Sequence, residues 1–259
     1  MAGASVLTQL LVRATRDLRY EPAFFRALLN ATVYAHVPLG DPISRRLRFI
    51  QFHHPETGQL LLPFFTDKRK ARAATGSDAR VVTLRGRVFL EATRGATLML
   101  NPNDERGTLY PEEIDVLLRT GYMARFESTK VQLGEEPLVG PTGFTPAWLL
   151  DLLTVSLAAL SYVKVGYLAS LHAVPGAGAP SLLLALGVDA GRGDRAVHAV
   201  ITALQPACRQ HQFALDIIHF IEPVERPAWV EAFGLRPVYE KSWGERLISN
   251  GQPISIRKS

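Results

Sequence analysis

Residues 162–188, YVKVGYLASLHAVPGAGAPSLLLALGV, decide the fold predicted for the second half of the chain. Two apolar runs, 162–171 and 181–188, lie on either side of the segment PGAGAP at 175–180. Runs of this length, rich in valine, leucine and tyrosine and bounded by glycine and proline, are typical of strands joined by a turn. The sequence therefore predicts a strand, a turn and a second strand here.

The segments around this unit extend it to a complete domain. Apolar periodicity predicts helices at 146–159 and 194–209 and further strands at 130–133 and 213–221, with a long loop at 134–146. The resulting order is β-α-β-β-α-β, the ferredoxin-like order. The tail beyond about Pro223 is expected to hold one short helix and irregular structure.

The first half of the chain also mixes helices and strands. Helices are predicted at about 5–16, from Pro22, at 66–75, at 87–92 and from Pro111 to Gly121, and strands at 32–38, 47–53, 59–65, 81–84 and 96–100. The strands 47–53 and 59–65 are expected to form a hairpin around the turn residues of 54–58. We therefore predict an α+β protein of two small α/β-sandwich domains, residues 1–126 and 127–259.

A short basic segment follows the strand 59–65. Thr66 or Asp67 can cap the start of a helix, because a side-chain oxygen accepts hydrogen bonds from free backbone N–H groups. The helix carries a cluster of cations: Lys68, Arg69, Lys70 and Arg72. These four residues are the candidate protein-binding site, and an acidic protein surface is the expected partner. A solvated helix face with no partner is the alternative.

Charge is unevenly distributed along the chain. The whole sequence has 29 Lys and Arg against 24 Asp and Glu, a net charge of +5, and the surplus lies in residues 1–126. A basic half can meet an acidic protein, a membrane surface or nucleic acid. Few aromatic residues lie among these charges, so nucleic acid is not expected as a partner.

Composition is compatible with a soluble protein of the reducing cytoplasm, which is the location we expect, and export of a disulfide-free protein is the alternative. The single cysteine, Cys208, cannot form an internal disulfide. No apolar run approaches the roughly 18 residues that cross a membrane. Cys208 follows Leu204 by four residues on the predicted helix 194–209, so we expect a buried structural thiol rather than a reactive one.

Residue patterns for catalysis or cofactor binding are missing from the sequence. His53, His54 and Glu56 are the nearest approach to a metal cluster, but adjacent strand residues point to opposite faces, so no metal site is predicted. The glycines match neither a phosphate-binding loop nor a dinucleotide-binding turn, and no nucleophile elbow is present. We assign no catalytic residue and no cofactor.

Several motifs in this order resemble the SseB (enhanced serine sensitivity) family. The N-terminal ones are PAFFRALLNATVYAHVP, QLLLPFFTDKRKARA and ATLMLNPNDERGTLYPEEIDVLL; the C-terminal ones are KVQLGEEP, VKVGYLASLH, SLLLALGVD, FALDIIHF and RPVYEK. The resemblance implies an SseB N-terminal domain at 1–126 and an SseB C-terminal domain at 127–259. It also implies a cytoplasmic bacterial protein linked to serine tolerance, without assigned catalytic residues.

Two functions remain open at this point. The first is a non-enzymatic adaptor that binds another protein, indicated by the family resemblance and by the missing catalytic patterns. The alternative is an enzyme or a small-ligand sensor, such as an amino acid sensor, with a pocket between the two domains, since domain junctions commonly hold pockets.

Overall fold

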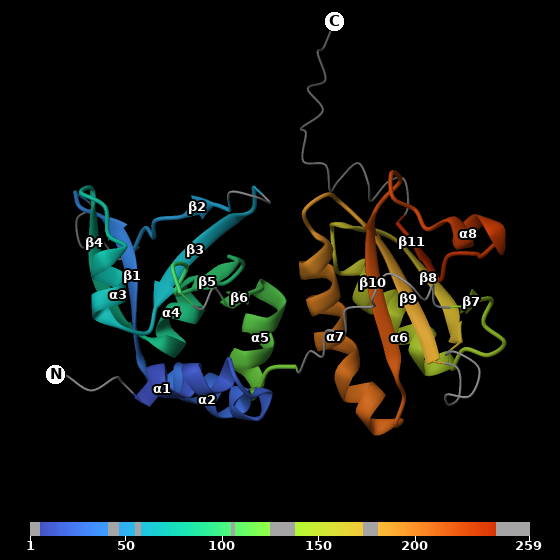
Figure 1. Ribbon diagram of the computed structural model, residues 1–259, viewed down its shortest axis with the longest axis horizontal. Helices are drawn as coiled ribbons and strands as arrows, with labels where there is room; N and C mark the ends of the chain where they lie inside the picture. Colours follow the sequence, from blue (N-terminus) through green and yellow to red (C-terminus); the bar gives the residue numbers. More distant parts are fainter. Residues whose placement is uncertain are drawn as a thin grey trace, which may run out of the picture. The chain divides into compact units, whose positions relative to one another are not determined.

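The computed structural model describes residues 6–40, 47–54, 58–104, 107–124, 138–172 and 181–241. The chain divides into two compact units, Met1–Arg125 and Phe126–Ser259, and each contains both helices and sheet (Figure 1). The protein therefore has the predicted α+β architecture. The predicted domain boundary, between residues 126 and 127, lies outside the described residues.

The N-terminal unit is built on a mixed sheet with the strand order β4-β1-β3-β5-β6, and β2 pairs with β3. Its strands are β1 (Thr32–Pro38), β2 (Phe52–His53), β3 (Leu60–Phe65), β4 (Ala79–Arg85), β5 (Leu98–Leu100) and β6 (Gly107–Leu109). The pair β3–β5 is parallel, and the other pairs are antiparallel. Strand β1 matches the predicted strand residue for residue.

The helices of this unit cover the two faces of the sheet unequally. They are α1 (Val6–Ala14), a 3-10 turn η1 (Leu18–Tyr20), α2 (Glu21–Asn30), α3 (Lys68–Ala73), α4 (Gly86–Ala92) and α5 (Pro111–Thr120). Helices α1, α2, α4 and α5 share one apolar core with Val33 and Ala35 of β1. Helix α3 contacts His36, which alternation along the strand places on the opposite face. The basic helix therefore lies apart from the main core of its unit.

The prediction for residues 47–53 was wrong over most of its length. Only Phe52 and His53 pair with β3, opposite Leu61 and Leu60. Phe49 instead packs edge-on against the buried ring of Phe89, with 5.5 Å between ring centroids. The backbone N–H of Ile50 donates to the carbonyl of His36 on β1 at 2.9 Å rather than to β3, so periodicity alone misassigned most of the segment.

The C-terminal unit contains a second mixed sheet with the order β10-β9-β8-β11, and β7 also pairs with β8. Its elements are β7 (Leu138–Gly140), α6 (Ala147–Ala158), β8 (Val163–His172), β9 (Ser181–Val188), α7 (Gly193–Gln210), β10 (Leu215–Ile221), α8 (Ala228–Ala232) and β11 (Tyr239–Glu240). The elements from β7 to β10 follow the predicted βαββαβ order along the chain. Strand β7 lies inside the segment predicted as a loop, and the predicted strand at 130–133 lies outside the described residues.

Strands β9 and β10 lie side by side at one end of this sheet. They are parallel neighbours, in register from Leu182 with Leu215 to Val188 with Ile221, and α7 connects them. No third strand separates the pair. Both strands therefore end at the same edge of the sheet, where parallel α/β units commonly place their ligands.

Two apolar layers enclose the C-terminal sheet. Helices α6 and α7 pack on one face, where Leu149, Leu153 and Leu157 of α6 are fully buried. A smaller cluster on the other face joins Phe220 of β10 to Val230 of α8. Every buried leucine of α6 adds about 2–3 kcal/mol of transfer free energy, so the helix is fixed by its apolar face.

Candidate functional site

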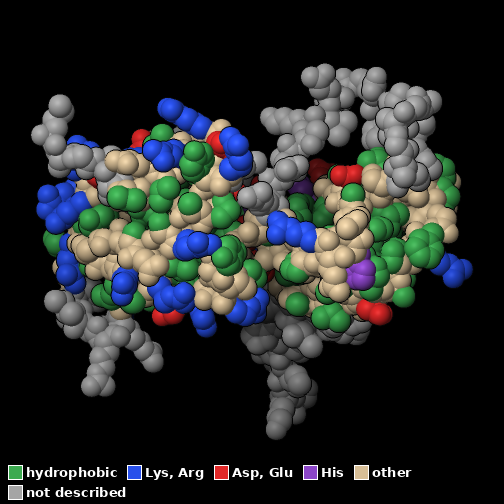
Figure 2. Space-filling model, turned by 90° about the horizontal axis from the view of Figure 1, so that it is seen from below, with side chains coloured by type: hydrophobic (Ala, Val, Ile, Leu, Met, Phe, Trp, Pro, Cys, Tyr) green, Lys and Arg blue, Asp and Glu red, His purple; other side chains and the backbone are tan. Residues whose placement is uncertain are grey.

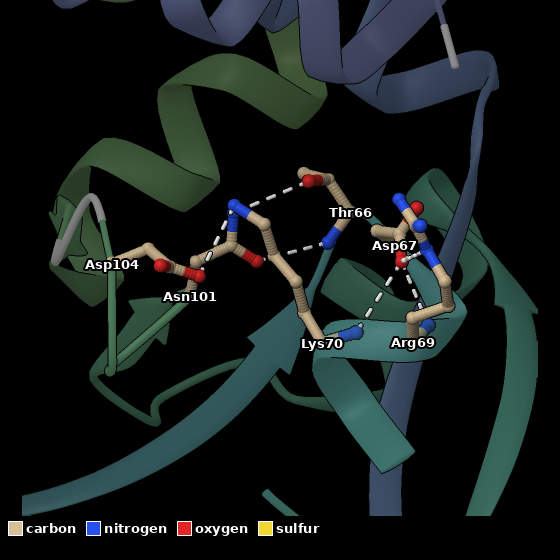
Figure 3. A network of polar contacts seen from close by, with 6 residues as sticks. All are labelled: Thr66, Asp67, Arg69, Lys70, Asn101 and Asp104. Carbon is tan, nitrogen blue, oxygen red and sulfur yellow. Dashed lines mark hydrogen bonds and ion pairs between the residues drawn. The ribbon is translucent and has the colours of Figure 1, made fainter. Parts of the chain in front are cut away.

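The basic helix α3 is capped by Asp67, one of the two residues predicted to cap it (Figure 3). The Asp67 carboxylate accepts hydrogen bonds from the backbone N–H groups of Arg69, at 2.7 Å, and Lys70, at 3.3 Å. Partial burial opposes ionisation of Asp67, but these two N–H groups outweigh it and lower the pKa of the carboxyl below its ordinary value. The cap is therefore a charged carboxylate that holds the first turn.

A buried asparagine fixes the junction between β3 and α3. Asn101 is 0% exposed, and its Oδ1 accepts a hydrogen bond from the backbone N–H of Thr66 at 3.1 Å. Its Nδ2 donates to the Thr66 hydroxyl at 3.2 Å (Figure 3), and its own backbone N–H donates to the carbonyl of Phe64 at 2.9 Å. The backbone of Asn101 is left-handed, with φ of 43°, a conformation that asparagine tolerates better than most residues. The loop after β5 thus clamps the start of the helix.

The far end of α3 is anchored by a buried histidine. Ala71 is fully buried, and its carbonyl oxygen lies 2.8 Å from Nε2 of His36. The Thr75 hydroxyl donates to the same carbonyl at 2.7 Å and lies 3.0 Å from Nε2. Because a carbonyl can only accept, Nε2 carries the hydrogen. Helix α3 is therefore held at both ends by buried polar contacts.

The four predicted cations divide into two groups. The Lys70 ammonium lies 3.2 Å from the Asp104 carboxylate, so this side chain ties the helix to the loop after β5. The Arg69 side chain is 85% exposed, although its Nε lies 3.5 Å from Asp67. Lys68 and Arg72 are exposed and form no ion pair within the described part of the chain. Three of the four cations therefore face solvent, and Lys70 is an anchor.

The other residues considered in the sequence lie apart from this site. His53 and His54 lie at the end of β2, and Glu56 is outside the described residues. Among the residues that the structure describes, there is no group of three His, Cys, Asp or Glu side chains able to hold a metal ion. Cys208 is half-buried on α7, and burial raises the pKa of its thiol, which disfavours the reactive thiolate. No helix in the described ranges is long and apolar enough to span a membrane.

Sequence reasoning missed two residues of the site, Asn101 and His36. Asn101 lies 35 positions beyond Thr66 and His36 lies 35 positions before Ala71, so local patterns do not link these pairs. The available signal was the Asn-Pro pair that ends the strand at 96–100. Asparagine is common in tight turns, because it tolerates a left-handed backbone. Here the turn directs the Asn101 amide toward Thr66, at the end of the neighbouring strand β3.

The fold and the site define a two-unit α+β protein that presents a firmly anchored basic helix from its N-terminal unit. A family model described as the SseB protein N-terminal domain matches residues 7–115. Protein SseB of Escherichia coli (strain K12) and Protein SseB of Shigella flexneri are each 26% identical to the chain over 250 residues, which cover 92% of the chain and 93% of each relative. No solved structure matches the chain. The chain thus resembles the SseB family, over most of its N-terminal unit in the family model and over nearly its whole length in the two relatives.

Proposed function

We propose that this protein is a non-enzymatic adaptor of the cytoplasm that binds an acidic surface of a partner protein through helix α3. Lys68, Arg69 and Arg72 form the contact set, called here the basic face. The observation that carries the proposal is the way in which α3 is anchored to the rest of its unit. Its ends are fixed by buried polar contacts while the basic face is exposed to solvent.

The physical advantage of this anchoring is that the basic face is already ordered before a partner binds. A loop of equal charge would lose conformational freedom on binding, at about 0.5–1.5 kcal/mol per ordered side chain and more for the backbone. Helix α3 has already been ordered during folding. The basic face can therefore use its charge for steering and for contacts with carboxylates.

Positive charge is not confined to α3. Figure 2, which views the molecule from below, shows blue Lys and Arg side chains dispersed among apolar and neutral ones on the N-terminal unit. Arg13 and Arg16, near the end of α1, are exposed cations outside α3. The dispersed cations supply a matched control for the basic face.

The test compares two triple reversals of equal charge. The first variant changes the basic face and is Lys68→Glu/Arg69→Glu/Arg72→Glu. The control variant changes three exposed positions, one on α1, one just after α1 and one on α5, and is Arg13→Glu/Arg16→Glu/Arg119→Glu. Quantitative affinity capture should show partners that are lost from the first variant and retained by the second. Lys70 stays unchanged, because its reversal would also break the contact with Asp104.

A charge-swap experiment with a purified partner completes the test. Acidic residues of that partner are reversed to lysine, and binding to the basic-face variant should be restored. Binding of the wild-type pair should weaken as salt rises, since screening at physiological ionic strength acts over about 8 Å. Equal capture by all three proteins, or a swap that restores nothing, would remove α3 from the interface.

In this proposal, the serine tolerance linked to the family depends on partner binding. An adaptor that lost its partner would produce a phenotype without losing any reaction of its own. In cells that lack the natural protein, the basic-face variant should therefore fail to restore serine tolerance, although it accumulates to the wild-type level. The control reversal should restore it.

A further inference from the structure

A pocket of about 340 Å³ opens at one edge of the sheet in the C-terminal unit. Its walls come from the start of β8, from the segments that follow β9 and β10, and from β11. Asp189 is the first residue after β9, and Glu222 is the first after β10. Both parallel strands therefore end at the pocket, which is where open α/β sheets commonly bind ligands.

Charged side chains of both signs line this pocket. They are Lys164, Asp189, Glu222, Arg226, Glu240 and Lys241. Three are cationic and three are anionic, so the lining carries no net formal charge. A strongly anionic or cationic ligand would meet repulsion from half of these groups, and an apolar ligand would desolvate them without replacement contacts.

Two ion pairs fix the charges in place. The Lys164 ammonium lies 2.8 Å from the Asp189 carboxylate, which joins the start of β8 to the end of β9. Arg226 forms an ion pair with Glu222, one turn earlier in the chain. Groups held in this way offer fixed electrostatic partners to a ligand, so binding requires little reorganisation.

The deeper part of the pocket brings together an ammonium and a carboxylate. Lys241 is only 6% exposed, and its ammonium donates to the Ser161 carbonyl. The Glu222 side chain is only 11% exposed. A positive and a negative group thus lie in a single pocket with restricted access to water, where charge–charge interactions are stronger than at the surface.

A phenol and an aliphatic side chain complete the lining. Tyr167 and Val165, both on β8, are buried and line the same pocket. Burial raises the pKa of the Tyr167 hydroxyl, against a smaller opposing effect of Arg226, so this group stays protonated at neutral pH. A neutral hydroxyl can donate one hydrogen bond and accept others.

We propose that this pocket binds a small zwitterion, a molecule that carries one carboxylate and one ammonium group. The ligand carboxylate lies toward Lys241 and Arg226, and the ligand ammonium lies toward Glu222 and Glu240. Free amino acids are the simplest compounds with this pair of groups, and the volume suits a ligand of that size. The site is independent of the basic face, so either proposal can fail without the other.

The first experiment measures binding of each of the twenty amino acids to the full chain by isothermal titration calorimetry, at ligand concentrations up to about 10 mM. At least one should bind saturably. For that amino acid, the methyl ester lacks the carboxylate and the N-acetyl form lacks a charged ammonium. Each should bind about tenfold more weakly or worse, because a buried charged group in the site loses its partner.

The second experiment assigns the binding to the pocket. Lys241→Met and Arg226→Gln should each weaken binding of that amino acid by about tenfold or more. Arg226 lies at the rim and is 34% exposed, so its replacement tests the site even if Lys241→Met fails to fold. The basic-face reversal serves as the control and should bind normally. The proposal is overturned by no binding of any amino acid, by equal binding of the blocked derivatives, or by unchanged affinity in Arg226→Gln.

Discussion

Replacing Asn101 with alanine should destabilise the N-terminal unit by roughly 2–4 kcal/mol. The substitution removes the acceptor for the Thr66 backbone N–H, which is buried and bonded at 3.1 Å, and the donor to the Thr66 hydroxyl at 3.2 Å. An unsatisfied buried donor costs about 1–3 kcal/mol. Alanine must also adopt the left-handed backbone of position 101, which adds about 1 kcal/mol.

A glycine at the same position separates the two contributions. Asn101→Gly loses the same side-chain hydrogen bonds, but glycine accepts a positive φ without a steric cost. We therefore expect the glycine variant to be about 1 kcal/mol more stable than the alanine variant, after allowance for the flexibility that glycine adds to the unfolded chain. For a unit of about 125 residues, a loss of 2–4 kcal/mol lowers the melting temperature by roughly 8–16 °C.

The positions of the tryptophans allow the measurement to be assigned to one unit. Trp148, Trp229 and Trp243 all belong to the C-terminal unit, so tryptophan fluorescence reports its unfolding. Far-UV circular dichroism reports both units. Urea titrations of Asn101→Ala should show an earlier dichroism transition with a smaller change in the fluorescence midpoint. A dichroism shift equivalent to less than about 0.5 kcal/mol would refute the clamp, because surface substitutions alone reach that size.

Three further predictions concern the fold and the titrating groups. Gly86→Ala should cost more than about 3 kcal/mol in urea unfolding, since its Cβ would lie 1.8 Å from the Leu28 carbonyl oxygen, and a near-normal midpoint would contradict this. The Asp67 pKa is lowered below its ordinary value of 3.8 on folding, so its stabilising effect is complete above about pH 4 and is lost as pH falls through the folded value. Asp67→Asn should flatten that acid dependence. Cys208 should react with a thiol reagent much more slowly in the native protein than in urea, and equal rates would show an accessible thiolate.

Local signals were enough for the elements whose ends and faces are set by neighbouring residues. Helix α5 begins at Pro111 and ends before Gly121, which has a left-handed φ of 76°, as predicted from these two residues. The structure adds a capping contact: the Glu113 carboxylate accepts a hydrogen bond from the backbone N–H of Tyr110 at 2.8 Å. Strand β9 was likewise predicted residue for residue, because its apolar run is bounded by a proline and an aspartate.

Long-range packing decided the parts that the sequence could not supply. Apolar spacing along helix α7, taken alone, predicts a buried face of Val197, Val200, Ile201 and Leu204. Its fully buried residues include Ala196, Val200 and Leu204, so the face is rotated toward small side chains. The first turn of the helix also approaches β10 closely, since a Cβ on Gly193 would lie 2.2 Å from the ring of His219. No periodicity within the helix contains that contact.

The candidate site shows the same division between local and distant information. The Asp67 cap and the run of cations were readable from adjacent residues, whereas the distinction between Lys70 and the exposed cations was not. It depends on Asp104, which lies in a loop that follows β5. The charged pocket of the C-terminal unit was also hidden, because its residues come from four separate segments between Ser161 and Lys241. Charge type is a local property, but the direction of a side chain is a property of the whole unit.

Helix α3 could not be stable on the strength of its own sequence. It has six residues, and isolated helices shorter than about 12–15 residues are marginal in water. It also buries one small apolar side chain, Ala71, so core packing contributes little to it. Its order must come from the Asp67 cap, the Asn101 clamp and the His36 contact. Under the function proposed above, Asn101→Ala should therefore reduce partner binding, although Asn101 is fully buried and cannot touch a partner.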